Sequence, residues 1–312
     1  MSQDRYSLFP CEFYYAGPTT LHLGQIMSVG VRPDSKKSVI VPAGMIDPQA
    51  VILAHADPRV VITTDDLLTA LTPVSITAGL ACPTGALLQY QKRSDGGTFA
   101  GGATNTLLTS KKGFLYPKSL SADQDDEKGC VLELEFAAQW DGSTSGTPAL
   151  PVPPLVIAVN AALTGAADFN SRYYMGPVYA NAVLQDGVAG WKIDFGIEYK
   201  TRRFNGDVWP QVGSIVKRTP RLSYRIMKTD LMSVVGSLFN AAAPGAIALY
   251  ARAGSSGAAR VSDATAGHVK ITAATSAWAA EEWEVEGEDD ATVTVGVDVT
   301  GTLALSTAST IP

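Results

Sequence analysis

The sequence predicts a mainly β protein with short helices, built as two tandem β-sandwich or barrel domains that each carry one helix. Strand-like segments alternate apolar and polar residues, and short stretches of the first half recur in the second. The 312 residues suffice for two domains, each able to bury its own core. We expect a first domain at 1–145, a linker region at 146–168 and a second domain, the internal duplicate, at 169–312. Gly, Ser and Pro concentrate at 141–154, which is typical of a linker.

The internal repeat is carried by five matches that keep their order along the chain. Their offsets drift by only a few residues, which indicates an old duplication with insertions and deletions in loops. We therefore expect residues 10–140 to superpose on residues 169–300 with the same order of elements. The matches are YYAGP with YYMGP (14–18, 173–177), PQ and PR with PQ and PR (48–59, 210–221), TTDDLL with KTDLM (63–68, 228–232), GALLQY with GAIALY (85–90, 245–250), and DDEKGCVLELEF with GEDDATVTVGV (125–136, 287–297).

Period-two alternation predicts half-buried antiparallel strands at 132–136, 192–199 and 293–299. Two further strands begin with proline, in PRVVITT and PRLSYRIM, where no ladder donor is needed.

Each of these two proline-led strands runs into a predicted short helix. The expected N-cap is Thr64 or Asp65 in the first half and Thr229 or Asp230 in the second. In the second half, LMSVVGSLF at 231–239 places its apolar residues on one helical face.

The halves align least well around WKIDFGIEYKTRRF at 191–204. This segment alternates strongly, whereas its counterpart at 26–37 alternates only briefly. We expect the two halves to differ most here, so this is where they do different jobs.

Composition argues against several classes of function. A net charge of −6 disfavours a general affinity for nucleic acid, which depends on Lys and Arg at the phosphates. No apolar stretch reaches the about 20 residues that span a bilayer, and the N-terminus lacks a signal-peptide pattern. We expect no membrane span, and a cytoplasmic protein until assembly or release.

No motif for catalysis, cofactor or metal binding is present, so we expect no enzyme, no cofactor and no metal. The acidic run at 123–127 resembles the start of a calcium loop, but Lys128 stands where that loop needs Gly and Leu134 where it needs Glu. The histidines are scattered, and the cysteines are odd in number without CxxC spacing, which favours buried free thiols. These residues are His22, His55, His268, Cys11, Cys82 and Cys130.

Basic residues cluster at the same relative place in both halves, and a tryptophan follows the second cluster. In an acidic protein such clusters predict a charged interface with acidic loops of another subunit, and the alternative is a solvated loop. The candidate interface residues are Lys36, Lys37, Lys200, Arg202, Arg203 and Trp209.

A duplicated β domain without catalytic residues indicates that the duplication serves a symmetric assembly. When a ring-forming domain is duplicated and fused, half as many chains complete the ring, so six copies need three chains. Edge strands would then join neighbouring copies.

Three segments resemble the major tail tube protein of a long-tailed (siphovirus-like) bacteriophage. They are KIDFGIEYKTRRFNGDVWP at 192–210, the short helix expected after PRLSYRIMKTDL, and ATVTVGVDVTGTLALSTAS at 291–309. The resemblance covers most of each half, without an obvious immunoglobulin-like decoration domain. It implies tail-tube-like β-sandwich domains and trimer rings with pseudo-sixfold symmetry, stacked into a conduit for DNA during ejection.

The partners that this resemblance implies are the chain itself, the tape-measure protein, other tail proteins and DNA in transit. The implied location is the virion tail, with host cytoplasm during assembly. A lumen of net negative charge would repel phosphate and let DNA pass. The alternatives are a capsid decoration or other virion structural protein, and a small-molecule-binding protein with a site between the two halves.

Overall fold

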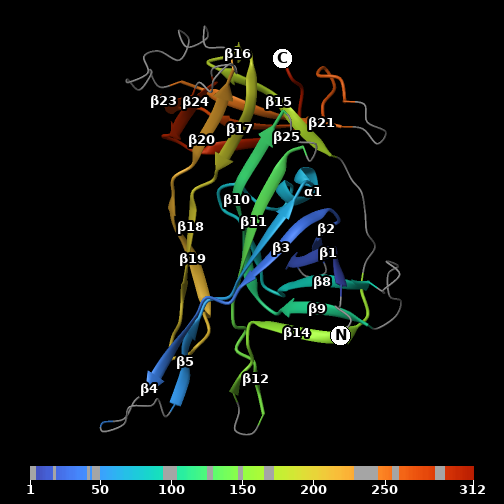
Figure 1. Ribbon diagram of the computed structural model, residues 1–312, viewed down its shortest axis with the longest axis vertical. Coiled ribbons are helices and arrows are strands. Elements are labelled where there is room, and N and C mark those ends of the chain that lie inside the picture. The colour runs from blue at the N-terminus through green and yellow to red at the C-terminus, as the bar shows by residue number, and fades with distance from the viewer. Residues whose placement is uncertain are drawn as a thin grey trace.

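The computed structural model of the chain is mostly β, and its paired strands run antiparallel (Figure 1). We call residues 5–161 the first half and residues 172–312 the second half. The structure describes residues 5–16, 19–40, 43, 50–93, 104–124, 129–146, 150–164, 172–227, 245–254, 260–284 and 292–312.

Each half contributes a five-stranded sheet of its own. The first-half sheet has the order β14 (Leu155–Ala161), β9 (Asn105–Ser110), β8 (Ala86–Arg93), β1 (Arg5–Ala16) and β2 (Thr19–Leu23). The second-half sheet has the order β25 (Leu303–Ser309), β22 (His268–Ala273), β21 (Ile247–Ala253), β15 (Tyr173–Ala180) and β16 (Val183–Gln185). The two sheets therefore repeat one pairing scheme.

A third sheet, which we call the shared sheet, runs through both halves. The first half supplies β3 (Ile26–Arg32), β6 (Arg59–Thr64), β11 (Val131–Ala138) and β10 (Gly113–Asp123), in that order, with β7 (Leu80–Cys82) beside β10. The order continues into the second half with β17 (Val188–Asp194), β20 (Arg221–Ile226), β24 (Thr292–Val299) and β23 (Ser276–Glu284).

Three two-stranded hairpins and one helix complete the described elements. Two of the hairpins extend the shared sheet at equivalent places, after β3 and after β17. The hairpins are β4 (Ser35–Ile40) with β5 (Ala50–Ala56), β18 (Ile197–Arg202) with β19 (Val212–Arg218), and β12 (Thr144–Ser145) with β13 (Leu150–Pro151); the helix is α1 (Leu67–Leu71).

The repeat extends to irregularities of register. A bulge interrupts the β10–β11 pair between Pro117 and Ser119, and the β23–β24 pair has one between Ala280 and Glu282. The β3–β6 and β17–β20 pairs also carry matching bulges, as do the two long hairpins. Because bulges are positional features of a strand, their recurrence shows which strands and residues of the two halves correspond.

The match of the two Tyr-Tyr motifs does not survive this comparison, and the match of TTDDLL with KTDLM at 228–232 lies outside the described residues. Tyr14 lies near the end of β1, opposite Thr20 of β2, whereas Tyr173 begins β15. The bulges of β1 and β15 instead place Pro10 at the position of Gly176, and Cys11 at that of Pro177. The alignment of β1 with β15 therefore follows from their strand partners and not from the two Tyr-Tyr motifs.

The expected single strand at 192–199 is in fact two strands with a turn between them. Gly196 has a φ of +58°, and a Cβ there would lie 2.0 Å from the carbonyl oxygen of Thr219. Asp34 takes the equivalent place with a φ of +36°. The halves thus share this backbone geometry, and they differ in the side chains that it carries.

Part of the expected linker region belongs to the first half. Strand β14, at Leu155–Ala161, pairs with β9 and completes the first-half sheet. The short helix α1 is present, and its N-cap is Asp66 instead of Thr64 or Asp65; Thr64 accepts a bond from the Asp66 amide through its hydroxyl. The helix expected at 231–239 lies outside the described residues.

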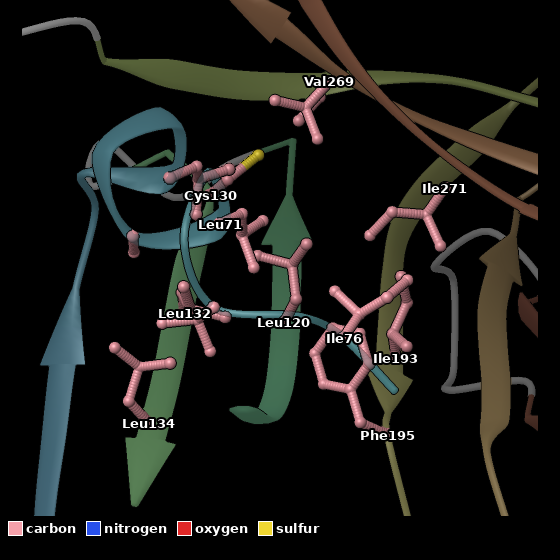
Figure 2. Packing of buried hydrophobic residues seen from close by; sticks show 14 of the residues in the cluster. Leu71, Ile76, Leu120, Cys130, Leu132, Leu134, Ile193, Phe195, Val269 and Ile271 are labelled. Atoms are coloured by element: carbon pink, nitrogen blue, oxygen red, sulfur yellow. The ribbon is translucent and has the colours of Figure 1, made fainter. Parts of the chain in front are cut away.

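One hydrophobic core extends through both halves, contrary to the expectation of two separate cores. Phe13 of β1 packs on Phe136 of β11 with ring centroids 5.6 Å apart, which makes the first half a sandwich. Figure 2 shows first-half residues such as Leu120 and Leu132 in the same cluster as Ile193 and others from the second half. The shared sheet makes this continuity possible.

The three cysteines are buried and free, as the sequence predicted. Burial raises the pKa of the Cys11 and Cys82 thiols to about 12, and it raises that of Cys130 as well.

Candidate assembly interface

The two halves meet edge to edge through the pairing of β10 with β17. In this antiparallel register Ser119 lies opposite Asp194, and Leu120 lies opposite Ile193. Both apolar partners are fully buried. The Phe195 amide extends the ladder by donating to the carbonyl oxygen of Lys118 at 2.9 Å. A main-chain ladder of this kind is how one sheet adds a strand from another unit.

The β18–β19 hairpin reaches back over the first half and places an aromatic side chain on it. Tyr199 of β18 stacks on Phe114 of β10, with ring centroids 4.4 Å apart and planes 3° apart. Tyr116 lies at 5.7 Å, and Ala137 completes the cluster. The Gln139 amide donates to the Tyr199 hydroxyl at 2.5 Å. The buried ring thus has both apolar and polar partners.

Arg59 forms the charged centre beneath this hairpin. Its guanidinium lies 2.7 Å from the Asp57 carboxylate and 3.0 Å from that of Glu135, and it donates to the Tyr116 hydroxyl at 3.0 Å. It also donates to the backbone carbonyl of Tyr199 at 3.3 Å. One first-half side chain therefore holds the second-half hairpin directly.

The electrostatics of this centre favour the charged forms. Burial alone would lower the pKa of Arg59, but its hydrogen bond to Asp57 and the surrounding negative groups raise it. Burial likewise opposes ionisation of Glu135, but the bond from Tyr116 and nearby cations hold the pKa of this carboxyl below its ordinary value. The pair is therefore ionised at neutral pH.

Further hydrogen bonds run along the length of the hairpin and tie it to the first half. Three involve the turn between β18 and β19, and one involves the end of β19. They are Ala56 N to Val208 O (3.1 Å), Trp140 N to Pro210 O (2.7 Å), Lys112 Nζ to Gln211 O (2.9 Å) and Arg218 Nη1 to Thr77 O (3.1 Å).

Lys36 and Lys37, predicted as interface residues, lie on β4, and both are exposed. Lys200 and Arg202 lie on β18, the strand that corresponds to β4 in the second long hairpin, and they are exposed as well. Lys200 pairs with the adjacent Glu198 at 2.9 Å.

Arg203 and Trp209 lie half-buried in the turn between β18 and β19. Desolvation lowers the pKa of His55 in β5, and the charges of Arg203 and Lys36 lower it further.

Sequence reasoning missed the residues that hold the internal junction, namely Phe114, Tyr116, Tyr199 and Arg59. The alternation at 192–199 placed Tyr199 on one face of a strand. Nothing in the sequence indicated which part of the protein this face covers.

In the described part of the chain, no other element covers the two outer edges of the shared sheet or the β4–β5 hairpin. The shared sheet ends in β3 on one side and in β23 on the other. Val31 of β3 is 44% exposed, whereas its counterpart Ile193 is fully buried in the internal junction. The β4–β5 hairpin projects from the body in Figure 1 and exposes four large apolar side chains. They are Val39, Ile40, Val51 and Ile52.

A pocket of about 330 Å³ lies where the halves meet, lined by residues that include Ser121, Gly190 and Tyr224. The pair Arg225–Asp123, at 3.1 Å, lines it too. Among the described residues, no group of three or more His, Cys, Asp or Glu side chains is placed to hold a metal ion. Nor does any described helix have the length and apolar character to cross a membrane.

Comparison with protein-family models gave no match, and comparison with curated proteins gave no significant match.

Proposed function

We propose that the chain is a structural virion protein that assembles into stacked rings and forms a phage tail tube, a conduit for DNA during ejection. The observation that carries this proposal is the edge-to-edge junction of the two halves. It uses one edge of each half, and it leaves the two equivalent edges, β3 and β23, at the ends of the shared sheet.

A second copy of the chain can repeat the same junction. Pairing β23 of one chain with β3 of the next is a head-to-tail contact, which closes into a ring when the rotation per unit is right. Each chain adds eight strands to the path through the shared sheet, so three chains would close a barrel of 24 strands. Barrels of about 16 to 18 strands already leave an aqueous channel, so this barrel would enclose a lumen.

The exposure of equivalent residues supports the same pairing. Arg59, which the hairpin of the second half covers, is 12% exposed, whereas Arg221 at the equivalent position is 57% exposed. Val31 and Ile193 differ in the same sense. One of two equivalent surfaces is buried at the internal junction, and the other is exposed. The exposed surface is therefore suited to bind a second copy of the chain.

The remaining parts of the proposal concern partners and place. The chain would act in the virion tail, after assembly in host cytoplasm, with the tape-measure protein and other tail proteins as further partners. DNA would pass through without specific binding, since the net charge of −6 disfavours a hold on phosphate.

Electron microscopy and sedimentation velocity of the purified chain test this proposal. We expect rings of three chains with pseudo-sixfold symmetry around a lumen, and tubes where the rings stack. A chain that stays monomeric at high concentration would contradict it and would favour a small-molecule-binding protein that uses the pocket between the halves. Trimers that bind a capsid surface without forming tubes would favour a decoration protein.

A further inference from the structure

The internal junction serves as a template for the contact between chains, and matching bulges fix which residues correspond. The bulge of the β18–β19 hairpin lies between Glu198 and Tyr199, and that of the β4–β5 hairpin lies between Lys36 and Lys37. Lys37 therefore occupies in β4 the position that Tyr199 occupies in β18.

The surface that would receive Lys37 is the β23–β24 edge of the second half. Arg59 lies opposite Ala137 in the first half, and its counterpart Arg221 lies opposite Asp298 in the second. Asp298 thus stands where Ala137 stands in the aromatic cluster. By the same register, Phe114 and Tyr116 are replaced by Ala277 and Ala279.

We propose that Lys37 of one chain forms an ion pair with Asp298 of a neighbouring copy, where the internal junction has its tyrosine stack. The proposal rests on the ring assembly proposed above. The Asp298 side chain is 77% exposed, and its 3.6 Å contact with Arg221 leaves it open to a second cation. Lys37 is exposed on the uncovered hairpin.

The register that repeats the internal junction between two chains also places residues of opposite charge opposite each other. The internal pair Ser119 and Asp194 corresponds to Glu282 on β23 and Arg32 on β3. Opposite charges at directly opposed positions stabilise an antiparallel pair. The contact between chains thus has an ion pair at the place where the contact within a chain has the aromatic stack of Tyr199 and Phe114.

A consequence is that the two junctions respond differently to salt. Exposed ion pairs are screened over about 10 Å at 0.1 M ionic strength, whereas a buried aromatic stack is not. Raising the salt concentration should therefore weaken ring formation while each chain stays folded.

Charge reversal with rescue tests the ion pair. Asp298→Lys and Lys37→Asp are each expected to weaken ring assembly roughly tenfold or more in sedimentation velocity, because like charges would then face each other. The double variant, which restores opposite charges, should recover most of the assembly. Asp263→Lys is the control, because Asp263 is a half-exposed second-half carboxylate paired with Arg252 outside the proposed contact.

The outcomes separate this inference from the proposed function. If the wild-type chain forms rings and the single variants assemble equally well, or the double variant shows no rescue, the ion pair is refuted and the tube proposal stands. If the wild-type chain forms no rings at any salt concentration, the tube proposal fails and the ion pair fails with it.

Discussion

Replacing Tyr199 with alanine tests whether the β18–β19 hairpin is packed on the first half. The side chain is only 7% exposed, and it stacks on Phe114 at 4.4 Å. Truncating a buried aromatic residue costs about 3–5 kcal/mol, and the Gln139 amide would lose its acceptor as well. We expect the free energy of unfolding to fall by about 4 kcal/mol.

Two variants calibrate this loss. Tyr199→Phe keeps the ring and removes the hydroxyl that accepts from Gln139, so it should cost about 1 kcal/mol. Lys37→Ala at the equivalent exposed position should change stability by less than about 0.5 kcal/mol. Urea unfolding, at concentrations where the midpoint does not depend on protein concentration, measures all three. A loss for Tyr199→Ala as small as that for Lys37→Ala would refute the packing of the hairpin.

Three further predictions concern the charged residues of the junctions. The depressed pKa of Glu135 means that its stabilising contribution is present at neutral pH and is lost as the pH falls below the ordinary value of 4.5; urea unfolding across this range should show less pH dependence in Glu135→Gln. Arg59→Ala should cost about 3 kcal/mol because it removes a largely buried cation that pairs with both Asp57 and Glu135, whereas Arg221→Ala should cost less than about 1 kcal/mol; equal losses in urea would contradict the difference in burial. Reversing the exposed Arg202 to Glu should shift stability by only about 0.5 kcal/mol and impair assembly, so unchanged tubes in electron micrographs would exclude this end of β18 from the contacts between subunits or rings.

The sequence predicted the class of fold, because the alternation of apolar and polar residues in strands is a local pattern. Alternation identified the strands at 131–138 and 292–299, and the Pro-Arg match at 58–59 and 220–221 agrees with the register of the structure. The turn at Gly196 was missed, because alternation continues across a sharp change of direction when the flanking strands present the same side.

The interface was predictable only in part. The basic clusters predicted both long hairpins as exposed segments, because charged residues in a strand indicate that it is exposed to solvent. The packing of Tyr199 on Phe114 was not predictable, because it joins residues that are far apart in the chain and depends on how β10 meets β17. Strand β14, at 155–161, was hidden by a Pro-rich context that reads as a linker.

Cysteine cross-linking tests most directly the claim that β23 of one copy continues onto β3 of the next. Arg32→Cys and Glu282→Cys, combined in one chain, place thiols at positions that correspond to the internal pair Ser119 and Asp194. The same substitutions at Ser119 and Asp194 give the matched control, which should form a disulfide within the chain. The native cysteines are buried, so the introduced thiols dominate the reaction.

We expect covalent dimers and trimers for the Arg32→Cys, Glu282→Cys chain on a non-reducing denaturing gel, and none for the control. A chain that remains monomeric under conditions that oxidise the control pair would contradict the continuation of the sheet between copies.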